Sequence, residues 1–429
     1  MRDFVVVAIV LGVLPRVFMR PYVGILLWSW IGYMNPHKLA WGWARDLPLA
    51  EVAAIATCIG MLFSSERKQF PIRGITLLWL VMFAYFTLTT TLAIYPEFAW
   101  EQWSKVVKIQ LVALLTLVLI NDRTKVRQLV WVIALSLAFF GVKGGLYTLR
   151  TGGGGRVWGP PGGFIEGNNE LALALLMILP LLFFLRRHDP RPWVRNSLLV
   201  VICLTVLSII GSFSRGALLG LIACGLFLGL KSRRRVPVIL AALVATVAMF
   251  FVMPQSWWDR MGTIHTYQED NSAQGRLDAW TLAIKVADAR PFGGGFNFWT
   301  ADVYNAYGAK FIKPQYAHSI YFQVLGEHGW IGLVLFLSLF LGTWRMGSRI
   351  IRAAKTAPEF EWERDLASMV QVSLVAFAVG GAFLGMAYFD LPYHLVGIMV
   401  IMMTYMAKAV PNQVASDNLP THGAAFSRR

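Results

Sequence analysis

Residues 197–230 read SLLVVICLTVLSIIGSFSRGALLGLIACGLFLGL, two apolar runs that meet at a short polar turn. The runs cover 197–213 and 216–230, close to the roughly 17–20 residues that a membrane-spanning helix needs. Inside a bilayer the backbone has no water to bind, so an apolar run of this kind forms a helix. The stretch therefore indicates two membrane helices joined by a turn that carries Arg215.

The same kind of apolar run recurs along most of the chain. The runs lie near 4–15, 21–34, 48–64, 75–93, 105–120, 127–147, 170–185, 197–213, 216–230, 236–253, 319–344, 366–387 and 395–408. Hydrophobic residues make up 57% of the 429 positions and charged residues only 14%, whereas a soluble domain typically has about 25% charged residues. We expect an all-α polytopic membrane protein. Because Pro15 and Arg16 interrupt the first two runs, we expect about twelve transmembrane helices, with about thirteen as the alternative.

Basic residues give the chain an orientation, because short cytoplasmic loops are enriched in Lys and Arg. Five basic groups alternate with the apolar runs: Arg67, Lys68 and Arg73; Arg123, Lys125 and Arg127; Arg186, Arg187, Arg191 and Arg195; Lys231, Arg233, Arg234 and Arg235; Arg345, Arg349, Arg352 and Lys355. The pattern predicts that 34–47, 94–104, 148–169, 254–318 and 388–394 lie outside. Much of the net charge of +16 sets this orientation, so we expect a lipid bilayer, and no nucleic acid, as a partner.

The long external segment divides the chain. We expect an N-terminal transmembrane bundle over 1–253, an external loop over 254–318, C-terminal transmembrane helices over 319–408 and a disordered internal tail over 409–429. Within the loop, Leu277, Trp280, Ile284 and Ala287 follow a helical spacing, and Pro291 ends the pattern. The spacing predicts an amphipathic helix over 276–290 that lies on the bundle as a lid over a lateral cavity.

Three arginines fall on the side from which positive charge is usually excluded. Arg156 lies in the Gly-rich loop 152–169, Arg215 at the turn, and Arg276 at the start of the expected helix. Free N–H groups and the dipole at a helix start favour an anion. We expect the arginines to bind one, with a phosphate-bearing lipid as the candidate. The alternatives are contact of Arg215 with lipid headgroups and pairing of Arg276 with nearby acids: Asp278, Glu269 and Asp270.

His318 stands where the loop re-enters the membrane. A neutral imidazole near pH 7 can accept a proton from a hydroxyl nucleophile. Glu327 is expected to orient neighbouring groups or to be structural, and Asp390 lies in the last external turn, where it can add a polar contact. The external loops contain no Asp-x-Asp, His-x-x-x-His or Cys cluster, so we expect neither a metal site nor a cofactor.

Three motifs occur in a fixed order. They are Ser212-x-Ser214-Arg215-Gly216; Arg276-x-x-x-Trp280 with Pro291-Phe292-Gly293-Gly294-Gly295; and His318-Ser319-x-Tyr321 with Glu327-x-Gly329. Together they resemble the O-antigen ligase and polymerase family of bacterial inner-membrane glycosyltransferases. Met34-Asn35-Pro36-His37 and Trp41-Gly42 further resemble the branch of O-glycosylation ligases associated with exosortase systems.

The resemblance implies a lipid-dependent, GT-C-like glycosyltransferase with its active site facing the periplasm. Such an enzyme moves a glycan from undecaprenyl diphosphate to an acceptor hydroxyl, here expected on the lipid A core, by metal-independent inversion. Arg215 and Arg276 match the arginines that contact the diphosphate, and His318 matches the base. Trp280 and Tyr321, from the same motifs, are expected to contact substrate. Two further substrate-binding candidates, Arg156 and Asp390, rest on the residues alone.

Three other functions stay open. An O-antigen polymerase and a protein O-oligosaccharyltransferase of the same family share the motifs, and only the acceptor separates them from a ligase. A lipid-linked glycan flippase or other transporter belongs to a different class. It predicts a cationic cavity that traverses the bundle, whereas the external arginines are expected at one face.

Overall fold

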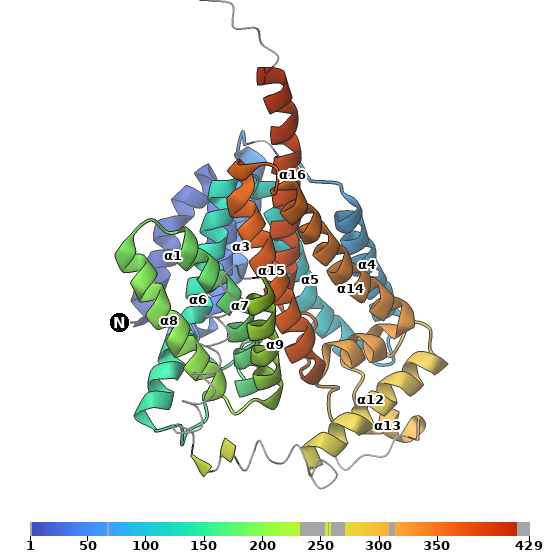
Figure 1. Cartoon of the computed structure of the whole chain (residues 1–429). Coiled ribbons are helices and arrows are strands. Elements are labelled where there is room, and N and C mark those ends of the chain that lie inside the picture. The colour runs from blue at the N-terminus through green and yellow to red at the C-terminus, as the bar shows by residue number, and fades with distance from the viewer. Residues whose placement is uncertain are drawn as a thin grey trace, which may run out of the picture.

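The computed structural model describes residues 2–66, 68–231, 254–255, 257–258, 271–308 and 314–417. In these ranges the chain forms α-helices and short 3₁₀ turns, and no strand (Figure 1). The N-terminal helices are α1 (Arg2–Met19), α2 (Tyr22–Met34), α3 (Leu49–Phe63), α4 (Gly74–Thr91), α5 (Pro96–Leu119), α6 (Arg123–Arg150), α7 (Asn168–His188), α8 (Pro192–Ile210) and α9 (Arg215–Lys231). The C-terminal helices are α12 (Asn271–Ala289), α13 (Ala301–Ala306), α14 (Ile320–Ala353), α15 (Glu361–Gly380) and α16 (Asp390–Asp417). The 3₁₀ turns are η1 (Trp43–Asp46), η2 (Pro358–Phe360) and η3 (Gly381–Phe383).

Many of these helices can cross a bilayer. Among the described residues, 8 are long and apolar enough to do so, and three further apolar helices are shorter: Tyr22–Met34, Leu49–Phe63 and Arg215–Gly229. A helical, multi-pass membrane protein is therefore confirmed. The run expected near 236–253 lies outside the described residues, and the count of about twelve spans stays a prediction.

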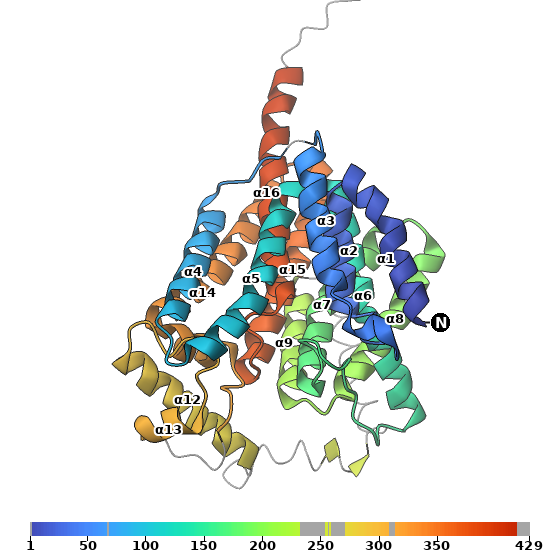
Figure 2. The same ribbon diagram turned by 180° about the vertical axis from the view of Figure 1, so that it is seen from behind.

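The bundle is built around helices that are apolar on every side. Each residue of α7 from Leu171 to Leu182 is buried, and α7 packs among α6, α8, α9 and α15. An all-round apolar helix belongs in the interior of a bundle, away from both water and lipid. In Figures 1 and 2, α7, α15 and α16 run through the middle of the molecule, and α1, α4 and α8 lie at its sides.

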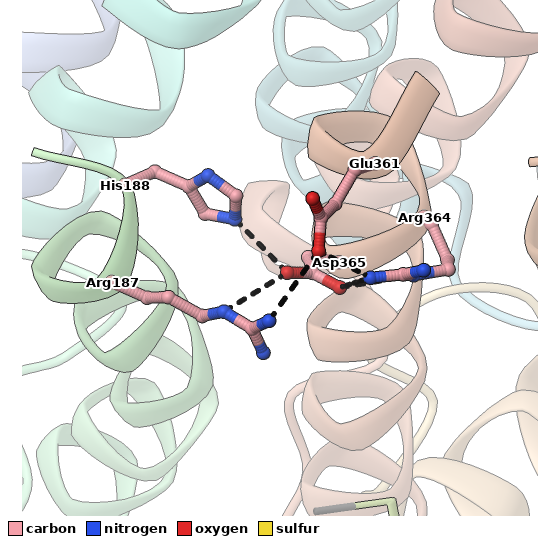
Figure 3. Close-up of polar contacts among 5 residues, drawn as sticks. All are labelled: Arg187, His188, Glu361, Arg364 and Asp365. Atoms are coloured by element: carbon pink, nitrogen blue, oxygen red, sulfur yellow. Dashed lines mark hydrogen bonds and ion pairs between the residues drawn. The ribbon is translucent and has the colours of Figure 1, made fainter. Parts of the chain in front are cut away.

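The two ends of the bundle differ. α12 and α13 lie across one end (Figures 1 and 2), which we call the cavity end. The opposite end, the basic end, carries Arg123, Arg187 and Arg352 at or near helix termini. There Arg187 and His188 at the close of α7 meet Asp365 near the start of α15, at 3.2 and 3.1 Å (Figure 3). The pairs of Arg187 and His188 with Asp365 join α7 to α15. Within α15, Arg364 reaches Glu361 at 2.8 Å.

The helix expected over 276–290 forms, with two corrections, and its role as a lid stays a prediction. It begins at Asn271 rather than at Arg276, so Arg276 lies beyond the first turn and the argument from a helix N-terminus does not apply to it. Its buried face holds Ala279, Leu282, Ala283 and Val286, whereas Leu277 and Ile284 from the expected stripe are 41% and 38% exposed. Both stripes have helical spacing. The buried face is the one with small residues, and it belongs to one apolar cluster with Phe298, Val303 of α13 and Ala317.

The last membrane helix also runs further than the sequence suggested. α16 continues to Asp417, so the first residues of the tail expected over 409–429 are helical. Once a helix is established, each added residue gains a backbone hydrogen bond at small cost, which explains the extension beyond the apolar run. The rest of that tail lies outside the described residues.

Candidate functional site

The turn that carries Arg215 is held by its own serines. Ser212 Oγ donates to Ile209 O at 2.6 Å and accepts from Ser214 N at 3.2 Å. Ser214 Oγ accepts from Ala217 N at 3.3 Å, the bond of a helix N-cap. Arg215 is therefore the first residue of α9. The favourable position for anion binding at a helix N-terminus, expected for Arg276, belongs to Arg215 instead.

Arg215 and Arg276 line one cavity at the cavity end. Its walls come from the start of α7, the turn and first residues of α9, α12 and the end of α15 with η3: Asn169, Leu173, Phe213, Ser214, Arg215, Gly216, Ala217, Arg276, Gly380, Phe383 and Leu384. The space between them is about 400 Å³. The sequence motifs predict a shared role for the two arginines, and the fold brings both to one wall although α9 and α12 are far apart along the chain. We call this space the arginine cavity.

A close approach of η3 to α9 shapes the arginine cavity. A Cβ at Gly216 would lie 3.2 Å from Phe383 Cβ, which is tighter than ordinary packing contact. A larger side chain at Gly216 would therefore push η3 away and change the cavity beside Arg215. This packing accounts for the glycine that follows Arg215 in the motif.

His318 lies at the edge of the arginine cavity. It is half-buried, and its Cα is 3.8 Å from the place that a Cβ on Gly385 would take, next to Leu384 of the cavity wall. Its backbone has φ +44, an uncommon conformation for a residue other than glycine that the surroundings must impose. Trp280 Nε1 donates to Ala317 O at 2.7 Å, and Tyr304 Oη donates to Gln315 O at 2.9 Å. The segment before His318 is thus fixed by side chains of α12 and α13.

The electrostatics of His318 suit a base. Burial lowers the pKa of its imidazole below the usual 6.5, and the positive charge of Arg276 lowers the pKa further. Both effects favour the neutral ring at pH 7. A neutral imidazole near Arg276 can accept a proton while a guanidinium holds an anion.

Glu327 joins three segments around the site. Its buried carboxylate accepts hydrogen bonds from Tyr388 Oη at 2.5 Å, Trp299 Nε1 at 3.2 Å and Asn297 N at 3.3 Å. The backbone adds Gly294 N to Gly326 O and Gly295 N to Glu327 O, at 2.8 and 2.9 Å. Glu327 therefore ties the chain after α12 to α14 and to the segment that leads into α16. This geometry fits the structural role expected for it.

Gly329 explains the second half of the same motif. Its φ is +68, and α14 breaks there into two helical pieces. A Cβ at this position would clash with Pro291 O. The break lies where α14 closely approaches Pro291 and Gly293, directly after α12.

Arg156 lies near the arginine cavity but not on its wall. Its guanidinium stacks at 5.7 Å from Trp158 and 5.8 Å from Phe213, ring centroid distances. The Gly-rich loop that carries it is bound to the Arg215 turn through Val157 N to Gly211 O at 3.0 Å and Asn168 Nδ2 to Ser212 O at 2.8 Å. Arg156 thus supports Phe213, whose other side faces the cavity.

The three remaining substrate-binding candidates make protein contacts. Trp280 donates to Ala317 O and stacks on Phe322 at 4.7 Å. Tyr321 Oη donates to Ala378 O at 2.8 Å, which joins α14 to α15. Asp390 is buried at the start of α16, 3.5 Å from the position of a Cβ on Gly32 of α2. None of the three lies on the wall of the arginine cavity as described, and their contact with substrate stays a prediction.

Sequence reasoning missed several wall residues. Asn169 at the start of α7 and Gly380, Phe383 and Leu384 near η3 line the cavity, and Glu170 lies close enough to Arg276 for an electrostatic interaction. The segment 380–384 carries no motif in the sequence. Asn168-Asn169-Glu170, a polar group at the mouth of an apolar run, is the only signal that could have pointed to α7.

A metal site would need several His, Cys, Asp or Glu side chains close together. Among the described residues, no three His, Cys, Asp or Glu side chains come close enough together to hold a metal ion. The polar groups that the fold gathers at the arginine cavity are cationic, imidazole, amide and hydroxyl groups, together with the carboxylate of Glu170.

Two regions of the chain match models of known protein families. Residues 1–190 match a family of unknown function (DUF5935), and residues 198–337 match the O-Antigen ligase family (Wzy_C). A comparison with curated proteins gives no match. The second region contains Arg215, Arg276, His318 and Glu327, together with the three motifs that suggested this family. The match over residues 198–337 therefore confirms the resemblance to the O-antigen ligase family that the motifs suggested for this region of the chain.

Proposed function

We propose that the protein is an O-antigen ligase, which transfers a glycan from undecaprenyl diphosphate to a hydroxyl of the lipid A core. One observation carries the proposal: Arg215 and Arg276, from separate helices, line a single cavity with His318 at its edge. A diphosphate is the part of the donor that two guanidinium groups recognise best. The family match of residues 198–337 supports a lipid-linked glycan as the substrate class.

The reaction is a single displacement at the anomeric carbon. The acceptor oxygen attacks from the side opposite the diphosphate, and its proton passes to the neutral imidazole of His318. As the new glycosidic bond forms, the bond from the anomeric carbon to the phosphate oxygen breaks, and its electron pair stays on the diphosphate. Arg215 and Arg276 stabilise the charge that develops there. The products are the glycosylated acceptor, with inverted configuration, and undecaprenyl diphosphate.

The membrane setting completes the proposal. The protein would span the bacterial inner membrane about twelve times in a GT-C-like arrangement, with the cavity end facing the periplasm. The basic residues at the opposite end support this orientation by the charge rule. The lipid tail of the donor would enter sideways between helices, and α12 would border the sugar site.

The test is transfer in a defined mixture. Purified protein is combined with an undecaprenyl-diphosphate-linked glycan, a lipid A core acceptor and EDTA. Glycosylated acceptor together with released undecaprenyl diphosphate is the expected result. Longer carrier-linked chains would instead identify a polymerase, and transfer only to a Ser or Thr peptide would identify a protein O-oligosaccharyltransferase. Movement of the donor across vesicles without transfer would identify a flippase.

A further inference from the structure

A second cavity lies at the basic end of the bundle, remote from the arginine cavity. Three segments enclose it: residues 69–71 before α4, residues 117–121 at the close of α5, and residues 401–408 of α16. The space is about 540 Å³. α5 and α16 both run from the cavity end to this end, so the two cavities are separated by the thickness of the bundle. We call it the headgroup cavity.

One cation, Lys408, lines the headgroup cavity, and a second, Arg73, binds Thr404 of its wall. Lys408 Nζ donates to Gln69 Oε1 at 2.8 Å. Arg73 donates through Nε to Thr404 Oγ1 at 3.0 Å and through Nη2 to Met403 O at 3.3 Å. Within the part of the chain that the structure describes, neither cation forms an ion pair. Their positive charges are therefore available to an anion.

Nearby acids are already matched with other cations. Tyr405, on the cavity wall, donates to Glu363 Oε1 at 2.7 Å. That carboxylate also takes two bonds from Arg123, each of 2.7 Å. Lys125, which donates to Asn121 Oδ1 at 3.2 Å, pairs with Glu66 at 3.2 Å. Among the described residues, the local excess of charge thus includes Arg73 and Lys408, together with Lys68 next to Gln69.

The headgroup cavity combines polar residues with an apolar part of its wall. Leu117, Val118 and Ile401 form part of its wall. On the segment that leads to it, Phe63 and Ile72 are 85% and 83% exposed. Large apolar side chains left open at this level are favourable only against hydrocarbon, so the segment lies at the membrane boundary. A cationic rim above an apolar wall fits an amphiphile better than a free anion.

We propose that the headgroup cavity binds an anionic phospholipid of the adjacent leaflet. Lys408 and Arg73 contact its phosphate, and an acyl chain lies along Leu117 and Ile401. Basic pockets between membrane helices recognise phosphate headgroups in this way. The lipid would link the segment before α4 to α16. The inference does not rest on glycan transfer, because the site lies at the other end of the bundle.

The experiment measures lipid binding by native mass spectrometry. Delipidated full-length protein is titrated with phosphatidylglycerol or with phosphatidylcholine of the same chains. We expect preferential retention of phosphatidylglycerol. The double variant Lys408→Gln/Arg73→Gln should bind it roughly 30-fold more weakly, about fivefold for each cation. The matched control Arg352→Gln/Lys355→Gln removes the same charge at exposed positions of the same end and should change binding less than about twofold.

Three results would overturn the assignment. Equal losses in the double variant and the control would mean that binding follows net charge alone. Equal retention of the two lipids by the wild type would remove the phosphate specificity. Displacement of phosphatidylglycerol by millimolar inorganic phosphate would show that the cavity takes a free anion. Lys408→Gln alone, at an exposed position, keeps the test valid if Arg73 proves necessary for folding. It should still lower binding about fivefold.

Discussion

Arginine serves two purposes at the two ends of this bundle. At the basic end, Arg187 of α7 pairs with Asp365 of α15 and joins the two helices, and Arg364 pairs with Glu361 within α15 (Figure 3). At the cavity end, Arg215 and Arg276 line a cavity of about 400 Å³ beside His318. The residue type is the same, but the groups that face it differ. A carboxylate of a neighbouring helix makes Arg187 a structural link. Arg276, although it lies near Glu170, also lines a cavity that we propose takes a substrate anion.

The first prediction compares variants that lack an arginine at one or the other end of the bundle. Arg215→Ala and Arg276→Ala should each lower the rate of glycan transfer roughly 10²–10³-fold, because each removes a charge that stabilises the leaving diphosphate. The rates are measured in the defined mixture, per folded molecule. Arg352→Ala, an exposed arginine at the basic end, is the matched control and should transfer at the wild-type rate. Wild-type rates in both cavity variants would show that the arginine cavity is not the diphosphate site.

The second prediction concerns the pH dependence set by His318. His318→Ala should lower transfer roughly 10²–10⁴-fold through loss of the base. In the wild type, burial and Arg276 hold the pKa of His318 below 6.5, so the rate should fall only as the pH drops through that lowered pKa. Arg276→Gln removes the repulsion, raises the pKa and should move this decline to higher pH. A profile that stays unchanged in His318→Ala would contradict the assignment of the base.

The third prediction addresses the basic end directly. Arg123→Ala leaves the buried carboxylate of Glu363 without its cation; the side chains are 46% and 0% exposed. We expect a loss of roughly 1–2 kcal/mol in the free energy of unfolding, less than for a fully buried pair because water screens Arg123. Thermal unfolding measures the loss. Transfer per folded molecule should not change, and a large decrease in it would show that the two ends are coupled.

The smallest decrease in glycan transfer is expected from a change in a residue that only positions His318. Trp280→Phe keeps the ring stacked on Phe322 but removes the hydrogen bond to Ala317 O. A bond of this kind contributes about 0.5–1.5 kcal/mol, so transfer should fall about two- to tenfold with the pH profile unchanged. Lys285→Gln removes donors to Tyr307 O and Gly308 O from the same helix and serves as the control. An equal decrease in both variants would mean that α12 acts as a whole rather than through Trp280.

The membrane helices and the Arg215 turn could be predicted from sequence because they depend on local patterns. Apolar runs between basic groups define membrane helices, and the serines around Arg215 are turn and capping residues. The start of α12 could not be placed, because Asn271–Gly275 contain no apolar spacing and the helix there depends on its neighbours. The prediction that Leu277 and Ile284 lie on the packed face of this helix was wrong for a related reason. Two faces had helical spacing, and only tertiary packing selected the one with Ala279 and Ala283.

The candidate site likewise contains residues that the sequence could identify and residues that it could not. Arg215, Arg276 and His318 stand out because polar residues beside apolar runs are costly and seldom accidental. Leu384 and Phe383 of the cavity wall are ordinary apolar residues, and their place follows only from the packing of η3 against α9. Tyr321, chosen from a motif, donates to a backbone carbonyl, and Asp390, chosen for its polarity, is buried beside Gly32 of α2. Their contact with substrate stays a prediction.

The proposed diphosphate site in the arginine cavity is tested most directly by the affinity for undecaprenyl diphosphate. This is the part of the donor that the two arginines are proposed to hold. The affinity is measured for the wild type, for Arg215→Ala/Arg276→Ala and for Arg352→Ala/Arg349→Ala at the basic end. Because the cavity variant removes two charge-assisted hydrogen-bonding groups at once, its affinity should be roughly 100-fold lower or more. The variant at the basic end should keep the wild-type affinity. Equal affinity in all three proteins would contradict the assignment of the arginine cavity as the diphosphate site.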